Sequence, residues 1–268
     1  MSEQTILGRQ GLVLGLPLCG RPVAPEWAIA LQSLNYPANM NLSISALKGV
    51  ETGEARCRIA QHALDIGAKY IFFLDDDVAP PYFAVRRLIY DLEQADPEFM
   101  VAGGIYANKH SYPAEPMVFQ EDGEGPFWRW KVGELFECGS IGTGCMVIKT
   151  EVFKHLAEPW FATINECDEA SDVRKFEMTD DLYFCKKVRE AGFKLLADGG
   201  VLCIHWDVFA CTCSHPAHQH DKTKAHQPCA ADGCKCSAYA MGGRAYVLPG
   251  DSYPLREAVV ATAATGGD

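Results

Sequence analysis

Hydrophobic residues in the first part of the chain alternate between short continuous runs and runs with helical spacing. Continuous or alternating apolar segments predict strands at 11–18, 41–47, 70–74 and 99–106. Apolar residues three or four positions apart predict helices at 26–34, 54–67 and 82–95. A regular succession of strand and helix is typical of a three-layer α/β domain with a mainly parallel central sheet.

The second part of the chain continues this pattern after a less regular stretch. Residues 107–137 predict loops with a short strand pair. Further on, the pattern predicts a glycine-rich turn entering a strand at 142–149, an amphipathic helix at 180–193, and strands at 194–198 and 201–206. Internal repeats are absent from the sequence.

Composition narrows the class of protein. The chain has 268 residues, 48% of them hydrophobic and 22% charged, which suits a globular domain with a substantial core. It contains no apolar run of the roughly 18 to 20 residues that a membrane-spanning helix needs, and its start lacks a signal-peptide pattern, so we expect a cytoplasmic protein. A net charge of −11 opposes nonspecific binding to nucleic acid.

Three consecutive aspartates, Asp75, Asp76 and Asp77, follow the predicted strand 70–74. Ligands of open α/β sheets bind beyond the carboxyl ends of the strands, and alternate residues of an extended segment point the same way. Asp75 and Asp77 are therefore expected to face one site and to bind Mg²⁺ or Mn²⁺, which prefer carboxylate oxygens. The alternative is that the aspartates form a solvated turn or cap the helix beginning near Pro81.

A short segment near the C-terminus is rich in metal-ligating residues. Five of the twelve cysteines and four of the eight histidines lie within 211–236, a density that indicates structural Zn²⁺ rather than disulfides in a chain without a secretory signal. The leading ligand set is the four cysteines of the two C-x-C pairs, Cys211, Cys213, Cys234 and Cys236. The competing ligands are Cys229, His215, His218, His220 and His226. The alternative is a flexible surface insertion that binds no metal.

Three blocks of sequence, in this order, carry a family resemblance. The blocks "GEARCRIAQHALDIGAKYIFFLDDDV", "GTGCMVIKTEVF" and "FEMTDDLYFCKKVREAGFKLLADGGVLCIHW" resemble those of GT-A glycosyltransferases of the family 2-like kind found in bacteria and phages. The resemblance covers roughly residues 11–208. It implies a Rossmann-like GT-A fold and metal-dependent transfer of a sugar from a nucleotide-diphosphate sugar, UDP-sugar favoured and GDP-sugar open, to an acceptor hydroxyl.

The resemblance also implies which residues bind the nucleotide sugar. The loop after the first strand would lie near the nucleobase and includes Pro17, Cys19 and Arg21. Arg56 and Arg58 would face the diphosphate, although Cys57 stands where the family often has Asn. The remaining donor-site residues implied by the resemblance are Asp75 and Asp76, with Gly142, Thr143 and Gly144 lining the sugar and acceptor pocket.

Catalytic and metal-binding roles follow from the same resemblance. Asp180 and Asp181 match an acidic pair at a helix start, and Asp181 is the favoured general base of an inverting enzyme. Both also suit a helix N-terminus, and the two interpretations are compatible. The implied ligands of Mn²⁺ or Mg²⁺ are Asp75, Asp77 and His205, for which a purely structural histidine is the alternative at the last position.

These patterns divide the chain into three parts. We expect a GT-A glycosyltransferase domain over 1–208, a Cys/His-rich zinc-binding insertion over 209–240, and a C-terminal segment over 241–268 whose tail is disordered or a frayed helix. The insertion departs from the family pattern and follows His205 closely, so we expect it to form a lid or an acceptor-docking module. The cell would be a bacterium or a phage-infected host.

Several alternatives remain open from the sequence. The acceptor is a glycan, lipid, protein, small molecule or, as a minority option, a hydroxylated base of phage DNA. A nucleotidyltransferase is a second enzyme class, although the loop after the first strand is a poor phosphate-binding loop. A zinc-dependent nucleic-acid-binding or interaction protein is a third class, which the acidic charge opposes. Oligomeric state and the stereochemistry of transfer are not determined by the sequence.

Overall fold

A computed structural model describes most of the chain. The described residues are 10–20, 22–109, 114–120, 125–168, 173–207 and 244–246. Within them, no helix is long and apolar enough to cross a membrane.

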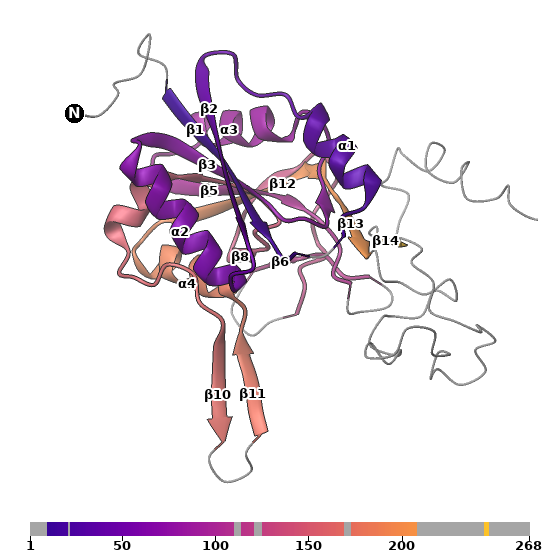
Figure 1. Cartoon of the computed structure of the whole chain (residues 1–268), viewed down its shortest axis with the longest axis vertical. Helices are drawn as coiled ribbons and strands as arrows, with labels where there is room; N and C mark the ends of the chain where they lie inside the picture. Colours follow the sequence, from indigo (N-terminus) through magenta and orange to yellow (C-terminus); the bar gives the residue numbers. More distant parts are fainter. Residues whose placement is uncertain are drawn as a thin grey trace, which may run out of the picture.

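A seven-stranded mixed sheet forms the centre of the molecule (Figure 1). Its strand order is β2 (Met40–Lys48), β1 (Gln10–Leu18), β3 (Ala68–Leu74), β9 (Cys145–Lys149), β5 (Phe99–Ile105), β12 (Lys194–Leu202) and β7 (Leu135–Cys138). Strand β9 runs antiparallel to both of its neighbours, and β7 runs antiparallel to β12. The other five strands run in one direction, so the sheet is mainly parallel, as the sequence predicts.

Helices cover the two faces of this sheet. The helices are α1 (Pro25–Ser33), α2 (Thr52–Asp65), α3 (Ala84–Gln94) and α4 (Asp180–Glu190), with a 3₁₀ helix, η2, at Thr150–His155. One core contains α2 and α4 residues, and the other contains α1 and α3 residues. Strand β3 supplies both cores, because Ile71 and Phe73 point to the first face while Tyr70, Phe72 and Leu74 point to the second.

Several short strands form small sheets beside the main sheet. Strand β4 (Val78–Ala79) pairs with β13 (Ile204–Asp207), which also pairs with β14 (Arg244–Tyr246), and β6 (Val118–Phe119) pairs with β8 (Ser140–Ile141). A hairpin of β10 (Ile164–Asp168) and β11 (Val173–Met178) projects from the body of the molecule (Figure 1). The sequence pattern did not predict this hairpin.

Most predicted elements agree with the structure to within a few residues. Two helices, α2 and α4, end just before the glycines that the sequence predicts at their C-termini. These residues, Gly67 and Gly192, adopt positive φ angles of 67° and 85°, which suit helix ends. One difference concerns the two strands predicted at 194–198 and 201–206. Instead, β12 continues through the two intervening glycines to Leu202, and a separate β13 follows.

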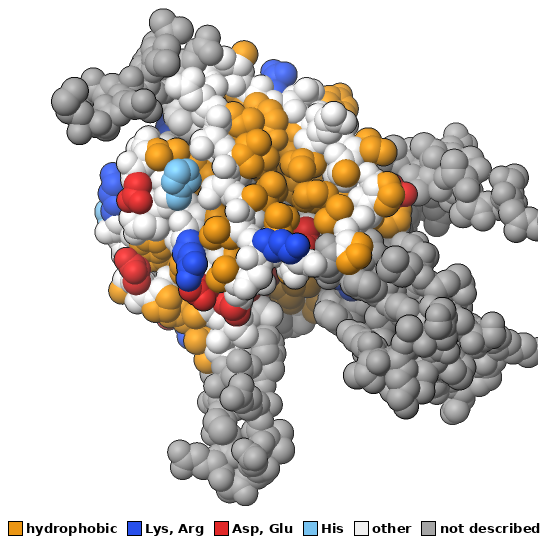
Figure 2. All heavy atoms as spheres, in the orientation of Figure 1, with side chains coloured by type: hydrophobic (Ala, Val, Ile, Leu, Met, Phe, Trp, Pro, Cys, Tyr) orange, Lys and Arg blue, Asp and Glu red, His pale blue; other side chains and the backbone are white. Residues whose placement is uncertain are grey.

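Strand β2 leaves an apolar strip at the edge of the sheet. Its residues alternate in exposure, and Leu42 and Ile44 are 41% and 62% exposed. Ile29 of α1 is also exposed. Figure 2 shows hydrophobic side chains gathered on the face where β2 and α1 lie in Figure 1. Within the described part of the chain, β2 hydrogen-bonds to β1 alone, so this sheet edge and its apolar strip face solvent.

A buried acidic pair links α3 to β12. The Arg87 Nε atom lies 3.1 Å from Asp91 Oδ1 and 2.9 Å from Asp198 Oδ2. The Asp198 side chain is fully buried, and its other oxygen accepts a hydrogen bond of 2.7 Å from the Gly200 amide. Burial raises the pKa of Asp91 to about 7, and the neighbouring Asp198 carboxylate adds to the rise, whereas Arg87 opposes it.

Replacing Asp91 by Asn should flatten the pH dependence of stability. Since the folded-state pKa of Asp91 lies above its ordinary value, the folded protein keeps a proton that the unfolded chain releases, and stability falls as the pH rises through this window. We expect the wild type to lose about 2 kcal/mol more than Asp91→Asn between about pH 5 and pH 7. Urea unfolding at a series of pH values measures this, and parallel curves for the two proteins would contradict it.

Candidate functional site

The aspartate triplet forms a turn at the carboxyl end of β3, and three other segments hold its backbone. The Asp75 amide donates to the Gly144 carbonyl at 3.1 Å, and the Trp27 indole donates to the Asp75 carbonyl at 2.7 Å. The Trp206 amide donates to the Asp77 carbonyl, also at 2.7 Å. The turn is therefore fixed by α1, the loop before β9, and β13.

Asp76, the middle aspartate, is buried and holds the loop after β1. Asp76 is 2% exposed, and its Oδ2 atom accepts a hydrogen bond of 2.8 Å from the Cys19 amide. This bond ties the loop after β1 to the turn after β3. Pro17 and Cys19, which the sequence resemblance assigns to the nucleobase site, thus lie at the same sheet edge as the aspartates.

Arg56 of α2 is the central cation of the site. Its side chain is 4% exposed and forms ion pairs with Asp75 Oδ1, at 2.6 Å from the Arg56 Nη2 atom, and with Asp180 Oδ2 from the Nη1 atom. Burial alone would lower the pKa of Arg56, but the charges of Asp75, Asp180 and Asp181 raise it. The guanidinium is therefore always charged and joins the end of β3 to the start of α4.

Burial also acts on the carboxylates around Arg56. It raises the pKa of Asp75, and the charge of Asp77 adds to this, while Arg56 opposes it. It raises the pKa of Asp180 in the same way, again against the effect of Arg56. Arg56 thus offsets much of the cost of burying two acids.

Asp181 lies in the first turn of α4. Its Oδ1 atom accepts hydrogen bonds from the Thr179 hydroxyl and, at 2.9 Å, from the Leu182 amide. The positive end of the helix dipole favours a carboxylate here. The helix-start interpretation of the acidic pair therefore holds alongside a catalytic one, and the catalytic role stays a prediction.

Asp77 faces His205 and a lysine that the sequence analysis missed. The His205 Nδ1 atom is 2.6 Å from the Ala107 carbonyl oxygen, to which a ring nitrogen bonds only as a donor. In the neutral ring the Nε2 atom then carries a lone pair, and it lies 3.3 Å from Asp77 Oδ1. The Lys109 ammonium contacts Asp77 Oδ2 and lies 3.4 Å from the Trp206 carbonyl oxygen.

This arrangement suits a cation. A lone pair and a carboxylate oxygen that face each other at 3.3 Å repel unless a proton or a metal ion lies between them. Nitrogen and carboxylate ligands of this kind bind Mn²⁺. Within the described residues, no group of three or more His, Cys, Asp or Glu side chains is arranged to hold a metal ion. Of the predicted metal ligands, Asp77 and His205 lie together, while Asp75 pairs with Arg56.

The glycine-rich loop packs against a second residue that sequence reasoning missed. The Tyr106 hydroxyl accepts a hydrogen bond of 3.1 Å from the Gly144 amide, and a Cβ atom added at Gly142 would overlap that hydroxyl. Thr143 is fully buried. The Tyr106 ring meets the His205 ring edge-on with centroids 5.2 Å apart, so this loop and the histidine share one wall.

Some predicted site residues lie elsewhere. Arg58 is 58% exposed and pairs with Glu54 on the outer side of α2, because residues two apart on a helix point in nearly opposite directions. Its contact with a diphosphate stays a prediction. The predicted residues outside the described part of the chain are Arg21, Cys211, Cys213, His215, His218, His220, His226, Cys229, Cys234 and Cys236.

Comparisons with known proteins extend the fold assignment. No protein-family model and no curated protein matches the chain. Among solved structures, A197 from STIV is similar, with 17% identity and a TM-score of 0.51 over 73% of this chain and 85% of that one. GalNAc-T7, solved with UDP, GalNAc and Mn²⁺, matches with 12% identity and a TM-score of 0.48 over 73% of this chain and 43% of that one.

The similarity to A197 shows a shared fold. The mixed, mainly parallel sheet with helices on both faces is consistent with the GT-A-like fold that the sequence resemblance predicted. The zinc-stabilised module of that prediction falls on residues outside the described part of the chain.

Removing the central cation should destabilise the fold far more than removing its neighbour on α2. Arg56→Met leaves the buried Asp180 and the partly buried Asp75 without a counter-charge, so we expect a loss of about 3–5 kcal/mol in the free energy of unfolding. Arg58→Met removes an exposed i,i+4 pair and should change stability by about 0.5 kcal/mol or less. Urea unfolding of both variants tests this, and equal losses would refute it.

Proposed function

We propose that this chain is a metal-dependent glycosyltransferase that moves a sugar from a nucleotide-diphosphate sugar, UDP-sugar favoured, to an acceptor hydroxyl. The observation that carries the proposal is the Asp77–His205 pair, in which two potential ligand atoms face each other 3.3 Å apart. The pair lies beyond the carboxyl end of β3 in a mainly parallel sheet, and α/β sheets bind ligands at the carboxyl ends of their strands. The sequence resemblance supports the same assignment, and the fold shared with A197 agrees with the α/β scaffold that the resemblance implies.

Asp77 and His205 would hold the divalent cation, Mn²⁺ or Mg²⁺. The Ala107 carbonyl fixes the ring of His205 through Nδ1 and so directs Nε2 toward Asp77. When bound, such a cation stabilises negative charge on a departing phosphate.

Cationic side chains would complement the donor. The Lys109 ammonium lies beside Asp77, within reach of a phosphate held at that residue. Arg56 forms ion pairs that position Asp75 and Asp180, and its contact with the diphosphate stays a prediction. We therefore add Lys109 to the residues proposed to bind phosphate.

Asp181 is our candidate for the general base that deprotonates the acceptor hydroxyl. Its Oδ1 atom already accepts two hydrogen bonds from Thr179 and Leu182, which orient the carboxyl group and leave Oδ2 as the atom for a proton. Asp180 is the weaker candidate because Arg56 occupies its Oδ2 atom. The role of Asp181 implies an inverting reaction.

Nucleotide binding tests this function directly. Calorimetric titration with UDP and GDP, in the presence and absence of Mn²⁺, should detect binding of one nucleotide that requires the metal. Asp77→Asn removes a charged ligand and should weaken that binding by about tenfold or more. Asp65→Asn is the matched control, because it removes the same charge from an exposed residue at the end of α2.

Two results would refute the proposal. One is the absence of binding by either nucleotide at any Mn²⁺ concentration. The other is binding that Asp77→Asn and Asp65→Asn weaken equally, since the effect would then come from net charge. Loss of binding in Asp77→Asn alone would support the site.

We also propose that the Cys/His-rich segment binds structural Zn²⁺. The support is its composition, five cysteines and four histidines within 211–236. Changing both Cys234 and Cys236 to Ser should lower the zinc content measured by elemental analysis of the purified protein. The control is Cys19→Ser, which changes an exposed cysteine outside the segment. Equal zinc content in the two variants would refute this site.

A further inference from the structure

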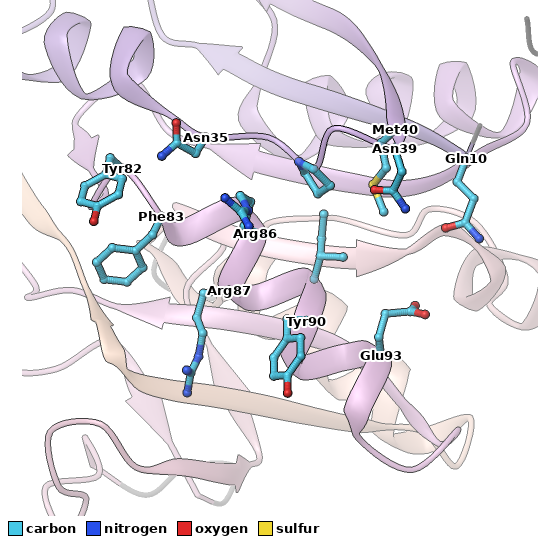
Figure 3. Close-up of a pocket in the computed structure, with 12 residues that line it drawn as sticks. Gln10, Asn35, Asn39, Met40, Tyr82, Phe83, Arg86, Arg87, Tyr90 and Glu93 are labelled. Atoms are coloured by element: carbon cyan, nitrogen blue, oxygen red, sulfur yellow. The ribbon is translucent and has the colours of Figure 1, made fainter. Parts of the chain in front are cut away.

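A groove runs beside helix α3, and its lining includes none of the three clustered aspartates. It has a volume of about 680 Å³, within the range of small-molecule sites. One wall is the outer face of α3. The other comprises the α1–β2 connection and the start of β1, as Figure 3 shows.

Exposed tyrosines mark the α3 wall. Tyr82, Arg86 and Tyr90 follow one another at intervals of four residues, which brings them onto one side of the helix and the turn before it. Tyr82 and Tyr90 are 59% and 58% exposed. Tyr82 lies just before α3 and Tyr90 lies within it, so the two rings occupy successive positions along this wall of the groove.

Carboxamide side chains mark the opposite wall. Asn35, Asn39 and Gln10 are exposed and line the groove from one end to the other (Figure 3). The backbone N–H of Asn35 donates to the backbone carbonyl of Tyr82 at 2.8 Å, which ties the two walls together at one end. Each carboxamide offers both donors and an acceptor, the combination that neighbouring hydroxyl groups require.

Charges along the groove are largely satisfied within the protein. Arg87 pairs with Asp91 and Asp198 beneath the helix. Glu93 accepts from the Tyr70 hydroxyl and pairs with Lys69 at 3.0 Å. Arg86 is the remaining charged residue of the described lining. One cation is a poor match for a polyanion, and the carboxamides are a poor match for an apolar chain.

We propose that this groove binds a neutral oligosaccharide. Tyrosine rings would stack on the C–H faces of sugar rings, while tyrosine hydroxyls and carboxamides pair with sugar hydroxyls. The groove begins at Tyr82, which follows Asp77 after strand β4 and two prolines. A saccharide bound here would extend toward the aspartate cluster as the acceptor; this acceptor role rests on the proposed function, whereas binding itself does not.

The test uses the full chain without nucleotide or metal. Maltohexaose, cellohexaose and N-acetylchitohexaose are titrated separately, and binding is followed by calorimetry and by saturation-transfer NMR. We expect at least one of these probes to bind. Tyr82→Ala and Tyr90→Ala should each weaken that binding by about tenfold or more, because each removes a stacking surface. Both side chains are exposed, so folding should be unaffected.

Trp128→Ala is the matched control, because it removes an exposed aromatic side chain outside the groove. The proposal is refuted if none of the three hexasaccharides binds, or if Trp128→Ala weakens binding as much as the tyrosine changes do. Preferential binding of a heparin-derived hexasaccharide or of an extended peptide would also refute it. If no saccharide binds but nucleotide binding still depends on the metal, the proposed function stands and only the proposal of a saccharide-binding groove is refuted.

Discussion

The buried guanidinium of Arg56 is the interaction on which the candidate site depends. It comes from α2 and bonds to carboxylates at the end of β3 and the start of α4, two segments far apart in the sequence. Burying one charge costs several kcal/mol, and the cost is offset only when the charges are paired with good geometry. The ion pairs therefore connect α2 and α4, which pack on one face of the sheet, to the carboxyl end of β3.

Hydrogen bonds to the backbone of the aspartate turn hold the site in place together with the ion pairs of Arg56. The backbone of the turn that carries the aspartates accepts hydrogen bonds from the Trp27 indole and the Trp206 amide, and it donates one to the Gly144 carbonyl. Each bond comes from a different element, so the turn cannot shift without breaking contacts in several of them. A site held this way is preorganised, and its side chains need little rearrangement to receive a ligand.

Local patterns predicted the elements of this fold well, and long-range pairings poorly. The strand before Asp75 and the helix after Thr179 were predictable because apolar spacing is a local property. The antiparallel course of β9 between β3 and β5 was not, since strand order depends on contacts far apart in the sequence. Lys109 and Tyr106 were missed for the same reason, because they lie in or beside a loop without a motif and reach the site only through the fold.

The three consecutive aspartates are tolerated because each carboxylate has a different kind of partner. Asp75 is neutralised by a buried arginine, and Asp76 accepts a backbone amide from the loop after β1. Asp77 faces the Lys109 ammonium and the Nε2 atom of His205, a ring whose Nδ1 atom is held by the Ala107 carbonyl. The triplet therefore combines an acid paired with an arginine and an acid bonded to a backbone amide with a third that lies against a lysine and a histidine, and the contacts of the first two fix the position of the third at the carboxyl end of β3.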